Sequence, residues 1–341
     1  MEAKPMELLR IGVVGCGAIG REHIDRITNK LSGGKVVAVS DVFVEGAHKV
    51  GDPIGATVYN NSADLVNDPD VDAIICTTPG FAHKETVMQA IEIGKPVFCE
   101  KPLTTTAEDS MDIVEAEIAG GKHLIQVGFM RRYDKGYRQV KEMLESGEFG
   151  APLYLKCTHW NPEVGTNYDT PMAVYDTAIH EIDVLHWLVG DEYESAQIMM
   201  PRQTKHTHPD LKDPQLMFLK CRSGLIAMVE VFVNCRFGYD INCQIVCEEG
   251  VIDLPSPAVP TYRKSGGLTT PIGHDWKKRF IEAYDTEIQE WINSTRKGEM
   301  NGPSAWDGFV ANLTADALVA SQQTGEVVPI DIGVVPEFYK K

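Results

Sequence analysis

Short apolar runs alternate with amphipathic segments through the first part of the chain. The apolar runs predict buried strands, and they cover residues 8–14, 35–40, 71–76, 97–99 and 123–127. Three segments between them have the apolar spacing of helices, and they cover residues 18–31, 82–93 and 107–119. Strands that alternate with helices of this length indicate an α/β domain with a parallel, doubly wound sheet. We expect this domain to cover residues 1–128.

The pattern changes in the second part of the chain, at residues 129–341. An amphipathic helix is predicted at 133–146, and the long strands that follow it are predicted at 153–159, 195–200, 215–221, 225–234 and 240–246. Strands that follow one another without intervening helices indicate an antiparallel sheet, and therefore a second domain of different architecture. Glycine and proline cluster at 255–273, which is typical of a long loop.

A glycine-rich run, Gly15-Cys16-Gly17-Ala18-Ile19-Gly20, connects the first predicted strand to the first helix. The first glycine suits a tight turn, the second lets backbone approach a pyrophosphate, and the third lets the helix pack closely on the strand. Asp41 ends the second strand, 21 residues after Gly20, where an acid can grip ribose hydroxyls. Residues 42–44 offer no cation for a 2′-phosphate, so we expect NAD rather than NADP.

Ligands of such sheets bind at the carboxyl ends of the strands, so other strand ends add candidates. Residues 77–79 follow the strand at 71–76 and would lie over the cofactor. Lys101 follows the strand at 97–99 and would present an ammonium group there; the alternative is a solvated loop lysine. The candidate cofactor-binding residues are Gly15, Cys16, Gly17, Ala18, Ile19, Gly20, Asp41, Thr77, Thr78, Pro79, His83, Glu100 and Lys101.

A third candidate element is the predicted helix at 175–188. Asp176 and His180 are four residues apart and share one face, so the carboxylate can hold the imidazole as a general base. The alternative is a helix-start aspartate beside a packed histidine. Asp183 and His186 add possible ligands, but no His-Glu-x-x-His pattern or distant ligand set is evident, so we expect no metal site.

Composition excludes several kinds of partner. The 341-residue chain has a formal charge of −17, which argues against nucleic acid and anionic membranes and favours a small molecule. We expect a cytoplasmic protein, because no run approaches the ~20 apolar residues of a membrane span and no signal peptide is evident. The eight cysteines are scattered without a CxxC pair, which is typical of reduced core thiols.

Three motifs in this order, Gly15-x-Gly17-x-x-Gly20, Glu100-Lys101-Pro102 and Asp176-x-x-x-His180, resemble the glucose-fructose oxidoreductase and inositol dehydrogenase family. Residues 128–134, 180–187 and 302–308 resemble the bacterial branch that acts on myo-inositol. The resemblance implies an NAD-binding Rossmann domain and a second domain with a large, open, mostly antiparallel sheet. It also implies a homotetramer built through that sheet.

The resemblance further implies catalytic roles for Lys101, Asp176 and His180. The implied reaction oxidises myo-inositol to 2-keto-myo-inositol, with hydride passing to nicotinamide and the hydroxyl proton to His180. Trp160 and Phe237 stand where more polar residues are expected. Alternatives are a dehydrogenase of scyllo-inositol, chiro-inositol or a pyranose, or a non-catalytic NAD-binding sensor. The implied substrate contacts are Lys101, Arg131, His159, Asn161, Asp176, Thr177, His180 and Tyr239.

Overall fold

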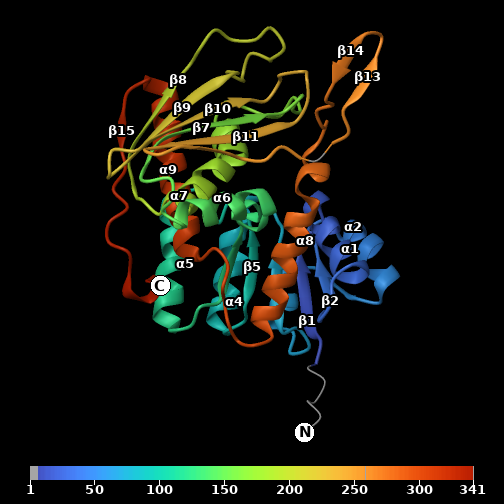
Figure 1. The fold of residues 1–341 in the computed structure, drawn as a ribbon. Coiled ribbons are helices and arrows are strands. Elements are labelled where there is room, and N and C mark those ends of the chain that lie inside the picture. Colours follow the sequence, from blue (N-terminus) through green and yellow to red (C-terminus); the bar gives the residue numbers. More distant parts are fainter. Residues whose placement is uncertain (1–6, 258, 341) are drawn as a thin grey trace. The chain divides into compact units, whose positions relative to one another are not determined.

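The computed structural model describes residues 7–257 and 259–340 (Figure 1). Of these, residues 7–129, 284–312 and 334–340 form one compact unit, and residues 130–283 and 313–333 form a second. This division differs from the single boundary after residue 128, because late segments of the chain return to the first unit.

The first unit contains a six-stranded parallel sheet of order β3-β2-β1-β4-β5-β6, so the predicted doubly wound sheet is confirmed. β1 lies between β2 and β4, and strand order reverses there. The short elements α2, β3 and α3 were not predicted. The strands are β1 (Leu9–Val14), β2 (Gly34–Ser40), β3 (Thr57–Tyr59), β4 (Ala73–Cys76), β5 (Val97–Glu100) and β6 (Ile125–Gly128). The helices are α1 (Ala18–Asn29), α2 (Val44–Gly51), α3 (Ser62–Asn67), α4 (His83–Glu92) and α5 (Ala107–Gly120).

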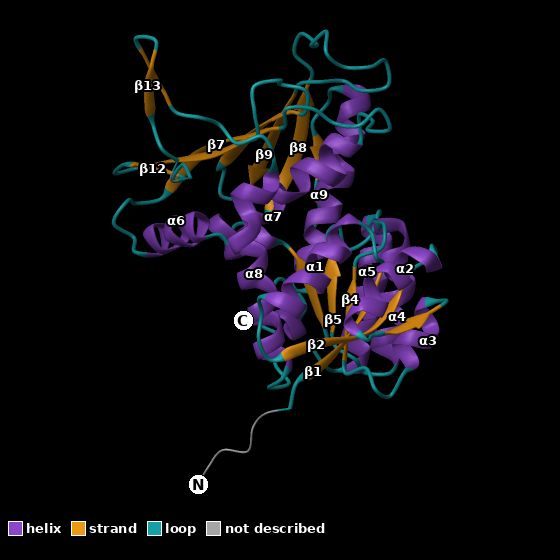
Figure 2. Cartoon of the chain, turned by 90° about the vertical axis from the view of Figure 1, so that its right-hand side faces the viewer, coloured by secondary structure: helices purple, strands orange, loops and turns teal. Residues whose placement is uncertain are grey.

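The core of the first unit explains its continuous apolar runs. All four residues of β4 and of β5 are buried, as expected for parallel strands covered on both faces. Helix α8 (Trp276–Thr295) adds Ile288, Trp291 and Ile292 to this core. Trp291 is fully buried and packs edge-on against Phe98 of β5, with ring centroids 5.8 Å apart. The sheet and its helices are visible together in Figure 2.

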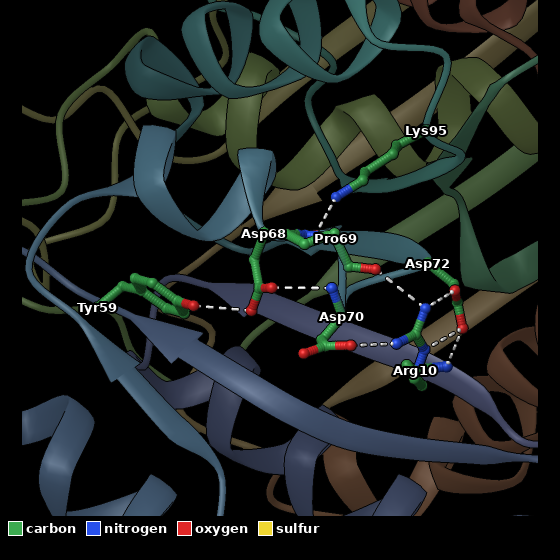
Figure 3. Close-up of polar contacts among 7 residues, drawn as sticks. All are labelled: Arg10, Tyr59, Asp68, Pro69, Asp70, Asp72 and Lys95. Atoms are coloured by element: carbon green, nitrogen blue, oxygen red, sulfur yellow. Dashed lines mark hydrogen bonds and ion pairs between the residues drawn. The ribbon is translucent and has the colours of Figure 1, made fainter.

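Polar contacts fasten the segment before β4 to the start of β1 (Figure 3). The Arg10 guanidinium donates to Asp70 at 2.7 Å and to Asp72 at 2.8 Å, and the Arg10 amide donates to Asp72 at 2.9 Å. Lys95 donates from Nζ to the carbonyl oxygens of Val66 and Asp68, each at 2.6 Å. These contacts lie at the amino ends of β1, β4 and β5, away from the carboxyl ends where ligands bind.

The second unit contains a seven-stranded sheet of order β12-β11-β7-β10-β9-β8-β15. Only the pair β7–β10 is parallel among the pairings of this sheet in the described residues, so the mostly antiparallel sheet is confirmed. Figures 1 and 2 show helices on one side of it. The strands are β7 (Pro152–Trp160), β8 (Tyr193–Met199), β9 (Gln215–Cys221), β10 (Ile226–Phe232), β11 (Asp240–Cys247), β12 (Val251–Asp253) and β15 (Val328–Pro329). The helical elements are η3 (Met130–Tyr133), α6 (Lys135–Glu145), η4 (Ala173–Ala178), α7 (Ile179–Val189) and the carboxyl-terminal part of α9 (Ala305–Thr324).

The expected loop at 255–273 contains a hairpin, β13 (Tyr262–Lys264) and β14 (Gly267–Thr269). Its turn residues Ser265 and Gly266 have φ of 51° and 77°, which is the backbone of a type I′ turn. The Ser-Gly pair is the signal from which the hairpin could have been predicted. Residue 258 of the expected loop lies outside the described residues.

The structure bears on two expectations from composition, the state of the cysteines and the membrane-spanning segments. All eight cysteines are buried free thiols, which confirms the prediction. Within the described part of the chain, no helix combines the length and the apolar character needed to cross a bilayer.

Candidate active site

The glycine-rich turn between β1 and α1 is held by contacts that need its glycines. Gly15 has a φ of +97°, in a region that glycine adopts readily. Its carbonyl oxygen accepts a hydrogen bond from the Thr77 hydroxyl at 2.6 Å. A Cβ on Gly20 would lie 2.1 Å from that same carbonyl oxygen, so only glycine fits. Thr77 therefore braces the turn, a role that differs from lying over a cofactor.

The amino end of α1 is open for an anion. Gly17 is the N-cap residue of this helix and offers no side-chain cap to its amide groups, which leaves N–H donors and the positive dipole end available. A Cβ on Gly17 would meet no described atom within 4 Å. This small, uncapped surface fits the pyrophosphate of a dinucleotide.

Asp41 is fixed at the end of β2. Its Oδ2 accepts a hydrogen bond from the Cys16 amide at 2.6 Å, and its Oδ1 accepts one from the Phe43 amide at 2.8 Å. A carboxylate has about four acceptor sites, so Asp41 can also receive ribose hydroxyls. Burial raises the pKa of the Cys16 thiol to about 12, so this side chain is a packing group of the turn.

His83 bridges the segments that follow β4 and β5. Its Nε2 lies 2.7 Å from the carbonyl oxygen of Thr78, and its Nδ1 lies 2.8 Å from that of Pro102. The ring is 1% exposed. Because both ring nitrogens face protein carbonyls, His83 is suited to brace these segments rather than to contact a cofactor directly.

Glu100, the last residue of β5, ends a buried chain of polar groups. Its Oε1 lies 2.7 Å from His23 Nε2, and His23 Nδ1 lies 2.6 Å from Arg26 Nη1. Burial lowers the pKa of His23, so we assign a neutral ring that accepts from Arg26 and donates to the Glu100 carboxylate. Burial alone would raise the pKa of Glu100, but His23 and Lys101 hold it below its usual value. Sequence reasoning missed His23 and Arg26, one turn apart on α1.

Two buried ion pairs join η3 to α7 in the second unit. Arg131 pairs with Glu181, and Arg132 donates from Nε to Asp183 at 2.9 Å and again from Nη2 at 2.5 Å. Arg131 and Glu181 are each 1% exposed. Burial opposes the charge on Glu181, but Arg131 and His159 hold its pKa below the usual value. Sequence reasoning missed Glu181, although it follows His180 directly.

This ion pair fixes the ring of His159. His159 Nδ1 lies 2.9 Å from Glu181 Oε2 and 3.1 Å from Arg131 Nη2. A proton on Nδ1 donates to the Glu181 carboxylate and leaves Nε2 as the acceptor, and in that tautomer Arg131 Nη2 is a neighbour of Nδ1 rather than its donor. The rings of His180 and Tyr239 lie near it, with centroids 6.3 Å and 5.8 Å from that of His159. Four of the predicted substrate residues, Arg131, His159, His180 and Tyr239, are therefore brought together.

The predicted helix at 175–188 begins as a π-helical turn. Asp176 and Thr177 belong to η4, which is such a turn, whereas His180 lies in the first turn of α7. Isolated π turns are rare and occur frequently at functional sites. The Thr177 Oγ1 lies 2.5 Å from the Tyr168 hydroxyl, which donates to the Met172 carbonyl oxygen at 2.7 Å. Tyr168 is a further residue that the sequence did not reveal.

The two departures from the family pattern lie away from the histidine cluster. Trp160 follows His159 on β7, and successive strand residues point to opposite faces of the sheet. Trp160 packs edge-on against Phe237, with ring centroids 5.3 Å apart. Asn161 follows Trp160 and is partly exposed. Its backbone N–H donates to the Phe232 carbonyl oxygen at 2.9 Å.

A Rossmann unit with an open helix terminus and a fixed acid, followed by a second unit with a buried histidine cluster, is typical of an NAD-dependent oxidoreductase. Family models match both parts of the chain. Residues 9–129 match the NAD-binding Rossmann fold of an oxidoreductase family, and residues 141–330 match the C-terminal alpha/beta domain of the same family. The chain belongs to this family, as the sequence motifs predicted, and is an NAD-dependent oxidoreductase.

Individual relatives extend this similarity over nearly the whole chain. An inositol 2-dehydrogenase of Serratia proteamaculans is 51% identical, over 98% of this chain and 99% of its own. An inositol 2-dehydrogenase/D-chiro-inositol 3-dehydrogenase of Halalkalibacterium halodurans is 51% identical, over 97% and 96%. The solved structure of myo-inositol dehydrogenase from Lactobacillus casei, in complex with NAD(H) and myo-inositol, is 44% identical with a TM-score of 0.96. That match covers 98% of this chain and 100% of the other.

We expect Gly17→Ala to weaken NAD binding at least about tenfold, because the added methyl would occupy the space of the pyrophosphate. The protein should keep its stability, because that methyl contacts no described atom of the protein. Gly20→Ala is the matched variant, and it should also lower the unfolding temperature, because its methyl collides with backbone. NAD titration calorimetry and thermal unfolding of both variants measure this. Wild-type NAD affinity in Gly17→Ala would contradict the assignment of the turn.

Proposed function

We propose that this enzyme oxidises one secondary alcohol of a cyclitol, with myo-inositol converted to 2-keto-myo-inositol as the principal reaction. The observation that carries the proposal is the near-complete likeness to a myo-inositol dehydrogenase bound to NAD(H) and myo-inositol. The cluster of Arg131, Glu181, His159 and His180 supports it, because a polyol needs several fixed polar partners.

His180 is proposed to accept the proton of the reacting hydroxyl. It is 9% exposed, and a histidine is suited to proton transfer near neutral pH. Asp176, four residues earlier, is proposed to orient the imidazole and stabilise its cation. Bound NAD would supply the hydride acceptor, held at Gly15–Gly20 and Asp41.

Lys101 is proposed to hydrogen-bond the reacting oxygen or its neighbour and to stabilise the developing negative charge. Support comes from the way its backbone is held: the Lys101 amide donates to Glu100 Oε2 at 3.2 Å. Glu100 is in turn fixed by His23 and Arg26. A fixed positive charge costs little reorganisation during the reaction.

The remaining substrate contacts are proposed to divide into direct and supporting groups. His159, Asn161, Thr177 and Tyr239 would contact the polyol. Arg131, which is 1% exposed, would act through Glu181 and His159 rather than by touching substrate. Because Tyr168 donates to a backbone carbonyl, it can accept the Thr177 proton, so Thr177 would present lone pairs to a substrate hydroxyl.

A second candidate is oxidation of D-chiro-inositol. The observation that favours it is the name of a relative at 51% identity, which carries both activities. Both substrates present a secondary alcohol in a ring of hydroxyl groups, so one set of polar contacts can serve either. The other isomers and pyranoses considered from the sequence are lesser candidates.

A substrate panel tests the proposed function. Purified protein should reduce NAD with myo-inositol at a kcat/KM at least about tenfold above that with scyllo-inositol or glucose, and NAD should be preferred over NADP because the Asp41 carboxylate repels a 2′-phosphate. Absorbance of NADH gives the rates. Faster turnover of D-chiro-inositol would select the second candidate, and turnover of glucose alone would contradict both.

The proposed base can be tested beside a matched histidine on the same helix. His180→Ala should lower kcat by ~10²- to 10⁴-fold with NAD affinity unchanged, because only proton transfer is removed. Lys101→Ala should also lower kcat. The control is His186→Ala, since His186 pairs with Glu192 at 3.1 Å outside the cluster. Steady-state kinetics and NAD titration measure the outcome, and unimpaired turnover of His180→Ala would overturn the assignment.

We further propose a homotetramer built through the seven-stranded sheet. Along β10 every second residue is buried, and the other face carries Ile226, Met228, Glu230 and Phe232, of which three are apolar and partly exposed. Phe218 of β9 pairs directly with Met228 and extends this apolar surface. Exposed apolar side chains gathered on one sheet face, here with Glu230 among them, are typical of a protein–protein interface.

The tetramer proposal predicts that Phe218→Glu with Met228→Glu yields smaller species, because two charges would be buried in the interface. The control is Leu268→Glu, at a residue 66% exposed on the hairpin β13–β14. Size-exclusion chromatography with light scattering gives the masses. A monomeric wild-type protein, or a double variant that remains tetrameric, would contradict the proposal.

We also propose a cytoplasmic location. The eight buried free thiols support it, because thiols persist in reducing compartments. The charge of −17 supports a small-molecule partner rather than nucleic acid or an anionic membrane surface.

A further inference from the structure

Two cysteines lie side by side where neighbouring strands of the parallel sheet end. Cys76 is the last residue of β4, and the strand register pairs it directly with Cys99 of β5. Both side chains are fully buried, and their sulfur atoms lie within 4.8 Å of each other. Neighbouring strands are about 4.8 Å apart, which falls within the ~4.4–6.8 Å between Cα atoms that a disulfide can span.

A histidine completes the group and changes the chemistry of one sulfur. His83 lies within the same 4.8 Å cluster. Each of its ring nitrogens faces a carbonyl oxygen, that of Thr78 at 2.7 Å and that of Pro102 at 2.8 Å. An imidazole this close to a thiol favours the thiolate whenever the ring carries a proton.

The two sulfurs therefore differ in protonation. The hydrogen bond from Cys99, the charge of His83 and the Thr78 hydroxyl, 3.6 Å from the sulfur, lower the pKa of the Cys76 thiol. Cys99 Sγ also lies 3.4 Å from the Glu100 carbonyl oxygen, so its one proton has acceptors on two sides. Burial and the neighbouring sulfur raise the pKa of Cys99. These surroundings favour a thiolate at Cys76 and a thiol at Cys99.

A second cysteine pair in the same protein lacks this activation. Cys157 of β7 and Cys243 of β11 are also paired in register and buried. Among the described residues, no histidine joins them in a three-residue group like that of Cys76. The hydrogen bond with Cys243 and burial raise the pKa of Cys157. Proximity is therefore common to both pairs, whereas a thiolate is expected only in the first.

The cluster is better suited to oxidation than to metal binding. Two thiolates and an imidazole are a common ligand set for zinc. Here, however, both nitrogens of His83 are engaged by carbonyl oxygens, so metal ligation would break one of these hydrogen bonds.

We propose that Cys76 is a peroxide-reactive thiolate and Cys99 its resolving thiol, so that oxidation links β4 to β5 by a reversible disulfide. Cys76 attacks one oxygen of hydrogen peroxide; an S–O bond forms, the O–O bond breaks, and the departing hydroxide takes a proton to become water. Cys99 loses its proton and attacks the Cys76 sulfur; an S–S bond forms and the second oxygen leaves as water. Two thiols are oxidised by two electrons, and one peroxide is reduced to two waters.

The disulfide would constrain both segments that lead to the cofactor. Thr77 and Thr78 follow Cys76 directly, and Lys101 lies two residues after Cys99. Peroxide is small, so a local opening of these strand-end segments is enough to admit it. Resting on the proposed function, we expect the oxidised enzyme to lose most NADH formation and to recover it with dithiothreitol.

The test treats the full chain with hydrogen peroxide, blocks remaining thiols by alkylation and maps peptides by mass spectrometry. We expect a peptide linked through Cys76 and Cys99 that dithiothreitol releases, with Cys157 and Cys243 still alkylated. Cys99→Ser should leave a sulfenic acid on Cys76 that a dimedone probe traps. His83→Gln should slow oxidation at least about tenfold, because an unassisted thiol is only a few per cent thiolate at neutral pH.

Cys157→Ser is the matched control and should form the link at the wild-type rate. Oxidation of Met143 and Met199, which are 39% and 53% exposed, verifies that the peroxide dose is sufficient. The proposal is overturned if these methionines oxidise without a Cys76–Cys99 link, if the Cys157–Cys243 link forms first, or if the linked enzyme keeps full activity. Peptide mapping does not depend on turnover, so a wrong substrate assignment would be recognised separately.

Discussion

The buried pair of Arg131 and Glu181 is the interaction on which the second unit's site depends. Removing two charges from water is costly, and such a pair is tolerated only when further hydrogen bonds complete it. Here the further hydrogen bond joins His159 Nδ1 to Glu181 Oε2. Loss of one partner from such a pair costs about 3–5 kcal/mol, because the other charge stays buried alone. The pair therefore fixes a single arrangement of η3, α7 and β7, and with it the ring beside His180.

The first unit supports its strand end by the same means. Arg26 donates to His23, which donates to Glu100, and Glu100 accepts the Lys101 amide. In both units a buried arginine supports a carboxylate, directly or through a histidine, and the carboxylate holds a residue that we propose to contact the substrate. Side chains locked in this way keep a site within the narrow geometry that catalysis needs.

Sequence reasoning recovered what local pattern encodes and missed what only tertiary contact creates. Apolar periodicity gave the parallel and antiparallel sheets, and the glycine spacing gave the turn that Gly15 and Gly20 make sterically necessary. Glu181 was missed because its partner lies 50 residues away in sequence. The bracing role of His83 depends on two carbonyl groups, which a sequence does not specify. The hairpin at Ser265–Gly266 could have been predicted from its turn residues. The packing of α8 in the core of the first unit could not, because no local pattern specifies it.

The two ends of the parallel sheet differ in how their polar groups find hydrogen-bond partners. At the amino ends, Arg10 and Lys95 bind carboxylate and carbonyl oxygens of the protein by direct contacts (Figure 3). At the carboxyl ends, the uncapped start of α1, the Asp41 carboxylate and the Cys76 sulfur keep reactive or accepting capacity. A dinucleotide site needs that capacity, and the same edge places Cys76 beside Cys99 and His83. The proposed sensitivity to oxidation would therefore follow from placing two cysteines at a ligand-binding edge.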